Sequence, residues 1–200
     1  MSNVDRPNGF KPVGTLTGSP WQSGLRLYQA DGSGSNLFPG DMVILEADGC
    51  IDIATSASLQ LLGVMVGKLL NNVNTTTGLV SDGMLSNTDP NLVKKYYDTA
   101  DGAGWILVAT DPNTLYEVQA DGTTPYTAIG SNCDILATAG STLTGRSQQE
   151  ISSTVATATT SGIRIVALSQ KPNNDVTAAN SKWIVKINDG HFTGVPNLGV

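Results

Sequence analysis

Six Asp-Gly pairs constrain the fold of this 200-residue chain more than any other sequence feature. Asp-Gly suits the two-residue turn that joins antiparallel strands, because both central residues of a type I′ turn need a positive φ angle, which this pair tolerates. The pairs begin at Asp31, Asp48, Asp82, Asp101, Asp121 and Asp189. Tight turns at this frequency predict an all-β chain of short strands.

Alternating or continuous apolar runs between the turns predict where the strands lie. We expect them at residues 25–30, 41–47, 50–54, 61–70, 129–137, 162–168 and 183–188. The run at 61–70 contains Gly63 and Gly67, which favour a buried strand with a bulge over a helix. In the last strand, Trp183, Val185 and Ile187 are expected to face the core. This spacing of short strands predicts a small β-barrel or β-sandwich with few or no helices.

Two segments leave alternatives open. Residues 152–161 hold seven Ser and Thr residues and fit either an exposed loop or a weak edge strand. Asp89-Pro90 could begin a short helix, with Asp89 as the N-cap and Pro90 in the first helical position. The residues that follow Pro90 alternate well enough to be extended instead.

The stretch from Gly104 to Ala120 is predicted to be a hairpin. Pro112 fits the second position of a type I turn over residues 111–114, with an apolar run on either side. Pairing the two runs would place one face in the core, formed by Trp105, Leu107, Ala109, Tyr116 and Val118. The other face carries Ile106, Val108 and Leu115 with Glu117 and Gln119. We expect that second face to be covered by the N-terminal arm, a second sheet or a partner subunit.

Residues 1–24 are predicted to form an extended N-terminal arm. Pro7, Pro12 and Pro20 exclude a helix there and disfavour a central strand. The arm also carries apolar side chains, which a disordered tail usually lacks, so we expect it to lie on its own domain or on a neighbouring subunit. These side chains are Phe10, Val13, Leu16 and Trp21. A single β domain over residues 25–188 and a mobile or partner-bound tail over 189–200 complete the expected organisation.

Composition and charge exclude several classes of protein. The net charge is −6, with no run of basic residues and no basic patch visible in the sequence, so nucleic-acid binding through phosphates is not expected. No apolar run approaches the ~20 residues that span a bilayer, and the N-terminus does not resemble a signal peptide. We therefore expect no membrane partner and synthesis in a cytoplasm. Cys50 and Cys133 are expected to be free buried thiols, although the sequence leaves a disulfide open.

Residues with catalytic or metal-binding chemistry are sparse. His191 is the single histidine, and it lies near the C-terminus without a Gly-x-Ser-x-Gly nucleophile motif anywhere in the chain. One histidine and two distant cysteines are too few for a zinc site, and no Asp-x-Asp-x-Asp calcium pattern occurs. The tryptophans could line a sugar-binding platform, but core packing is the commoner role for them. We expect no enzyme activity, no cofactor and no metal.

Four segments carry a resemblance to a known family. They read NVDRPNGFKPVG at 3–14, GWILVATDPNTLYEVQ at 104–119, Gly-Arg-Ser at 145–147 and SKWIVKIN at 181–188. In their order and spacing, the chain resembles the head decoration, or capsid cement, proteins of tailed bacteriophages, particularly those of marine and environmental phages. Residues 71–100 and 189–200 do not contribute to the resemblance.

The resemblance implies a structural protein on the outer surface of the virion head that stabilises the capsid by bridging major capsid subunits. Its partners would be the major capsid protein and further copies of itself, as a homo-trimer or homo-dimer. Candidate residues for contact with the capsid or a neighbouring subunit are Arg6, Phe10, Trp21, Ile106, Val108 and Leu115. The alternatives are another structural β protein of the virion head or tail, and a carbohydrate-binding or adhesin module.

Overall fold

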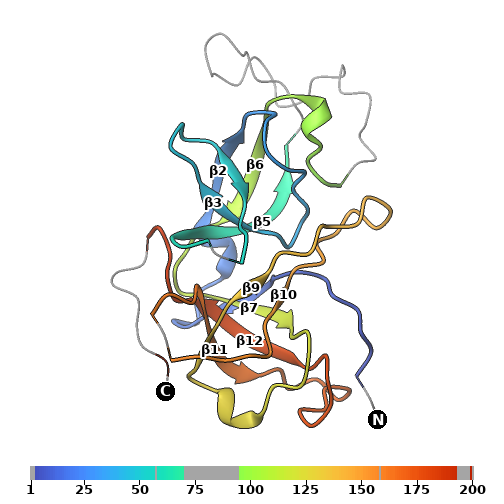
Figure 1. Ribbon diagram of the computed structural model, residues 1–200. Helices are drawn as coiled ribbons and strands as arrows, with labels where there is room; N and C mark the ends of the chain where they lie inside the picture. Colours follow the sequence, from blue (N-terminus) through green and yellow to red (C-terminus); the bar gives the residue numbers. More distant parts are fainter. Residues whose placement is uncertain (1–2, 57, 70–94, 158, 193–198, 200) are drawn as a thin grey trace.

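The computed structural model describes residues 3–56, 58–69, 95–157, 159–192 and 199, and these form an all-β fold (Figure 1). Within those ranges the helical elements are three short 3-10 turns, η1 (Trp21–Gly24), η2 (Thr99–Asp101) and η3 (Tyr126–Ala128). No described helix is long and apolar enough to cross a membrane. The prediction of an all-β chain with few helices is confirmed.

Two five-stranded antiparallel sheets make up most of the fold, one in the lower half of Figure 1 and one in the upper half. The lower sheet, here called the arm sheet, has the order β1 (Lys11–Thr15), β7 (Thr114–Gln119), β12 (Lys182–Ile187), β11 (Ile163–Leu168) and β8 (Asn132–Cys133). The upper sheet, here called the second sheet, has the order β2 (Leu25–Ala30), β6 (Gly104–Ala109), β5 (Leu61–Lys68), β3 (Met42–Leu45) and β4 (Ile51–Ile53). A two-stranded ribbon joins β9 (Ile135–Leu136) to β10 (Glu150–Ile151). The arrangement is consistent with a small β-sandwich.

One hydrophobic cluster connects the two sheets. It combines buried residues of the arm sheet, such as Tyr116 and Trp183, with Met42, Leu61 and Val64 of the second sheet. A separate cluster belongs to the second sheet alone and includes Val43, Leu62, Met65, Ile106 and Val108. The second sheet therefore contributes side chains to two buried clusters.

The predicted hairpin at 104–120 is wrong, because its two strands belong to different sheets. Strand β6 pairs with β2 and β5, whereas β7 pairs with β1 and β12. The turn itself forms, since the Thr114 N–H donates to the Asp111 carbonyl over 2.9 Å. A type I turn splays the strands it connects, whereas a type I′ turn matches their twist. The turn around Pro112 thus carries the chain from one sheet to the other.

The separation of β6 from β7 also reverses one of the predicted faces. Tyr116 and Val118 on β7, and Ala109 at the end of β6, are buried as predicted. On β6, Ile106 and Val108 are fully buried, whereas Trp105 and its neighbour Leu107 are only half-buried. Strand β6 packs into the cluster of the second sheet, which lies on the opposite side from the one that a hairpin required.

Most of the other predicted strands are confirmed to within a residue or two at their ends. Strand β5 is buried and shows a register irregularity between Met65 and Gly67, as the bulge prediction required. The three inward residues of β12, Trp183, Val185 and Ile187, are buried. Residues 129–137 form the short strands β8 and β9, and the described part of 152–161 contains no named strand. The alternatives for the segment after Asp89 fall mostly outside the described residues.

The described Asp-Gly pairs do not form turns of the predicted type. Gly32, Gly49 and Gly102 adopt positive φ angles, whereas no described aspartate does, so the type I′ prediction fails. Cys50 and Cys133 are both free and buried, as predicted.

Candidate functional site

The described part of the N-terminal arm is fixed to its own chain. The Asn3 side-chain amide donates to the Asp175 carbonyl at 2.7 Å and to the Ala179 carbonyl at 2.9 Å. The Phe10 ring is fully buried and meets Tyr116 edge-on, with the ring centroids 6.5 Å apart. Within the single chain, the described part of the arm therefore lies on its own domain.

Gln119, on β7, binds the arm between these two anchors. Its side-chain oxygen accepts from the Arg6 N–H at 3.1 Å, and its side-chain nitrogen donates to Asp5 Oδ1 at 2.9 Å. The same nitrogen donates to Glu150 Oε1 at 2.9 Å. A buried polar group is stable only when hydrogen-bonded, so Gln119 ties the backbone of the arm to the sheet.

The structure divides the six predicted interface residues into two groups. Phe10, Ile106 and Val108 are fully buried within the protein's own core, so they supply no surface to a partner. Their apolar character indicated burial, but the sequence could not distinguish burial inside one chain from burial between two. The other three remain accessible: Arg6 is exposed, and Trp21 and Leu115 are half-buried.

Apolar side chains gather where β1 forms the edge of the arm sheet. Gly14 is paired with Leu115, and the Leu16 N–H donates to the Asn113 carbonyl at 2.9 Å, which brings the end of the arm beside the β6–β7 turn. We call Val13, Leu16, Trp21 and Leu115 the arm patch. Val13 is 45% exposed and Leu16 is 50% exposed. An edge strand with exposed apolar residues is a typical surface for contact with another chain.

Beside the arm lie three adjoining hollows of about 100, 380 and 570 Å³. Arg6 and Lys182 line all three, so they form one continuous groove between the arm, the ends of β7 and β12, and the loop at 171–180. We call it the basic groove. Its charged lining residues are the cations Arg6, Lys11, Arg146, Lys171 and Lys182 and the carboxylates Asp5 and Glu117.

Glu117 neutralises only one of these basic side chains. Its carboxylate accepts from Lys171 Nζ at 2.5 Å and from the Ser169 hydroxyl at 2.7 Å. Burial raises the pKa of Glu117, but these hydrogen bonds and the charges of Lys171 and Lys182 outweigh it and hold the pKa below its usual value. Among the described residues, Arg6 and Lys11 form no ion pair, so the groove keeps a positive charge.

The sequence expectation that the chain has no basic patch is therefore wrong. Five of its 11 Lys and Arg residues come together in the groove, although they lie far apart in the sequence. No sequence signal could have found them, because the arm, the 171–180 loop and β12 meet only after folding.

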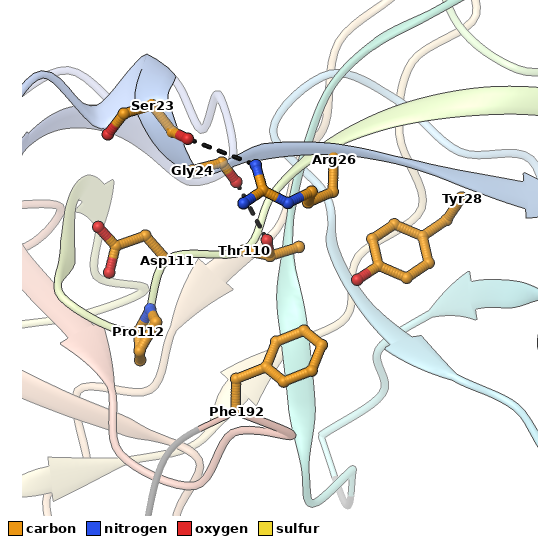
Figure 2. Close-up of a pocket in the computed structure, with 8 residues that line it drawn as sticks. All are labelled: Ser23, Gly24, Arg26, Tyr28, Thr110, Asp111, Pro112 and Phe192. Atoms are coloured by element: carbon orange, nitrogen blue, oxygen red, sulfur yellow. Dashed lines mark hydrogen bonds between the residues drawn. The ribbon is translucent and has the colours of Figure 1, made fainter.

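A separate hollow, of about 460 Å³ and outside the basic groove, lies at the start of β2 (Figure 2). Figure 2 shows Arg26 and Thr110 at its upper edge, Tyr28 on the right, and Phe192 below. Arg26 Nη1 donates to the Leu25 carbonyl at 2.9 Å, which steadies the guanidinium at the rim. Its lining combines two aromatic rings with a cation and the Asp111 carboxylate.

Carboxylates also gather at the far end of the second sheet. Ligand atoms of Asp31, Asp48 and Cys50 lie within 4.8 Å of one another. Burial, followed by the charges of Asp48 and Asp31, raises the pKa of Cys50 to about 11, so its thiol is protonated at neutral pH. Two carboxylates and one sulfur provide fewer ligands than the six to eight oxygens that calcium takes, and fewer than the four ligands of a structural zinc site.

Four carboxylates, two of them those of Asp31 and Asp48, give this end of the second sheet a concentrated negative charge. We call Asp31, Glu46, Asp48 and Asp52 the acidic tip. Burial, and then the charges of Asp52, Asp48 and Asp31, raise the pKa of Glu46, so these carboxylates repel one another.

Comparison with known proteins gives no relatives: no family model matches the chain, and no curated protein or solved structure matches it either. Inference about function therefore depends on the residues and geometry of the chain itself.

Proposed function

We propose that this protein is a structural virion component that binds the outer surface of a tailed-phage head and stabilises the capsid by bridging major capsid subunits. The observation that carries the proposal is the arm patch. The buried Phe10 anchors the arm, and β1 then presents Val13 and Leu16 to solvent at the edge of the arm sheet. The segments that resemble head decoration proteins contribute much of the arm, strands β6 and β7, and strand β12, which is the neighbour of β7 in the arm sheet.

An anchored patch suits a protein that acts by adhesion. Full burial of an aliphatic side chain contributes about 1.5–3 kcal/mol, so a few such residues form the centre of a useful contact. A patch held by Phe10 and Gln119 loses little conformational freedom on binding, because it is already ordered. Many copies on one shell then combine individually weak contacts into a strong net.

The test replaces the exposed apolar residues of the patch. A Val13→Ser, Leu16→Ser variant should bind heads built from the cognate major capsid protein about tenfold more weakly or worse, because two contact side chains lose their apolar surface. Binding is measured by co-sedimentation of purified protein with undecorated heads. Substitutions are preferable to deletion of the arm, since deletion would also remove Phe10 and strand β1.

The matched control is Leu59→Ser with Leu143→Ser, two residues 47% and 94% exposed outside the arm patch. This control should decorate heads like the wild type. Equal binding by the arm-patch variant, or no binding by the wild-type protein, would contradict the proposal. Negative-stain imaging of the virion distinguishes a head protein from a component of the tail.

A second candidate function is carbohydrate binding at the hollow of Figure 2. Its specific support is the pairing of Tyr28 with Phe192, which is 54% exposed, beside the charged groups of Arg26 and Asp111. Aromatic faces beside polar groups suit sugar rings. A glycan array compares the wild type with a Tyr28→Ala, Phe192→Ala variant, and no wild-type binding removes this candidate.

A further inference from the structure

Charge is distributed unevenly between the two ends of this molecule. The basic groove lies along the arm, β7 and β12, in the lower half of Figure 1. The acidic tip follows β2 and connects β3 to β4, in the upper half. A protein with a net charge of −6 thus keeps a groove with an excess of cations at one end and a cluster of carboxylates at the other.

The acidic tip is carried by the short connections at one end of the second sheet. It is centred on the tight turn between β3 and β4, closed by a hydrogen bond from the Glu46 N–H to the Cys50 carbonyl at 2.8 Å. Glu46 and Asp48 are exposed on this turn. No ion pair within the described residues neutralises the tip carboxylates.

The basic groove offers complementary groups. Arg6 and Lys11 are exposed and form no ion pair with a described carboxylate. When the two surfaces meet, attraction between opposite charges offsets the repulsion among the cations of the groove and among the carboxylates of the tip. Charge complementarity of this kind favours one orientation and speeds association.

We propose that the basic groove of one copy binds the acidic tip of a second copy, in a head-to-tail contact. The inference deepens the proposed function and rests on it for its biological setting, a shell whose copies contact one another. A second copy is favoured over another acidic protein because both complementary surfaces occur on this one chain. A head-to-tail contact closes into a ring or continues as a filament, so a closed trimer fits it better than a two-fold dimer.

Sedimentation velocity on the purified protein tests the contact without heads. The wild type should associate at ~50 mM salt, and its apparent dissociation constant should rise about tenfold or more at ~500 mM salt, because exposed charges are screened. A wild-type protein that remains monomeric at low salt would overturn the proposal.

Charge reversal then identifies the two surfaces. A groove variant, Arg6→Glu with Lys11→Glu, and a tip variant, Glu46→Lys with Asp48→Lys, should each lose self-association. The matched control is Lys95→Glu with Lys186→Glu, which changes the net charge as much as the groove variant does and lies outside the groove. The control should associate like the wild type, and circular dichroism checks that each variant is folded.

A mixing experiment distinguishes head-to-tail contact from other arrangements. In an equal mixture of the two variants, every contact between unlike copies pairs opposite charges, either the intact tip with the intact groove or the reversed tip with the reversed groove. The mixture should therefore associate, although neither variant does so alone. A chain carrying all four substitutions should associate again, because its charges are exchanged. No complex in the mixture, or no recovery in the fourfold variant, would overturn the proposal.

The two proposals can fail separately. Loss of head binding by the groove variant, with the wild type monomeric in solution, would assign the groove to the capsid and overturn the contact between copies. Failure of the arm-patch variant to weaken head binding would leave the sedimentation results unaffected.

Discussion

At the scale of single residues, Asp41 is the most unusual group in the protein. Its side chain is fully buried directly before β3, where Oδ2 accepts from the Phe38 N–H at 2.7 Å. Burial raises the pKa of Asp41 to about 6, although the Ser147 hydroxyl and the Phe38 N–H act in the opposite direction. In an unfolded chain an aspartate titrates near ~3.9, so the fold favours the protonated form.

Because the fold favours protonated Asp41, the unfolding free energy falls as the pH rises. Stabilisation by protonated Asp41 is complete below pH ~4 and is lost as the pH rises through about 6. Between those values the wild type should lose about 2–3 kcal/mol of unfolding free energy relative to Asp41→Asn, which cannot ionise. Urea denaturation of both proteins at pH ~4.5 and ~7.5 measures the difference. Parallel pH profiles would show that Asp41 does not titrate in this range.

At the scale of elements, the attachment of the arm depends on a close backbone approach at Gly9. Its φ angle is +66°, and a Cβ atom there would lie 2.4 Å from both the Gly40 carbonyl oxygen and the Ser147 Cβ. The next residue, Phe10, donates its N–H to the same Gly40 oxygen at 2.8 Å. The arm is thereby held between the second sheet and the segment around Ser147.

We expect Gly9→Ala to lower the unfolding free energy by about 1–3 kcal/mol, because an alanine fits neither the backbone angle nor the space. Gly14→Ala is the matched control on the same arm, since a Cβ atom there would have nothing within 4 Å and the φ angle of Gly14 is not positive. That control should change stability by less than about 0.5 kcal/mol. Urea denaturation compares the three proteins, and equal effects of the two substitutions would contradict this account of the arm.

At the scale of the whole molecule, the shared core couples the two sheets. Met42, Leu61 and Val64 of the second sheet pack in one cluster with Tyr116 and the other buried residues of the arm sheet. Gln149 adds polar links, accepting from the Met42 N–H at 2.7 Å and donating to the Ala54 carbonyl at 3.2 Å. Neither sheet can separate without exposing this cluster.

We therefore expect the two sheets to unfold in a single transition. A Trp21→Phe, Trp105→Phe variant leaves Trp183 as the fluorescent reporter of the arm sheet. A Trp21→Phe, Trp183→Phe variant leaves Trp105 as the reporter of the second sheet. In each variant, the fluorescence midpoint in urea should coincide with the midpoint by far-ultraviolet circular dichroism. Separate midpoints in either variant would indicate sheets that unfold independently.

The sequence by itself determined the all-β class, the positions of most strands and the burial of both cysteines. These properties follow from local chemistry: turn residues interrupt the chain at short intervals, and apolar alternation along β12 fixes which side chains point inward. The same local information correctly predicted that Tyr116 and Val118 are buried.

Only the tertiary structure decided which strands pair and which charged residues meet. The local pattern of 104–120 fits a hairpin, yet β6 and β7 separate, because each gains partners from distant parts of the chain and the type I turn splays them. That choice buried Ile106 and Val108 within the protein's own core and left Leu115 beside the arm. The basic groove has the same origin, since Arg6, Lys171 and Lys182 become neighbours only through contacts far apart in sequence.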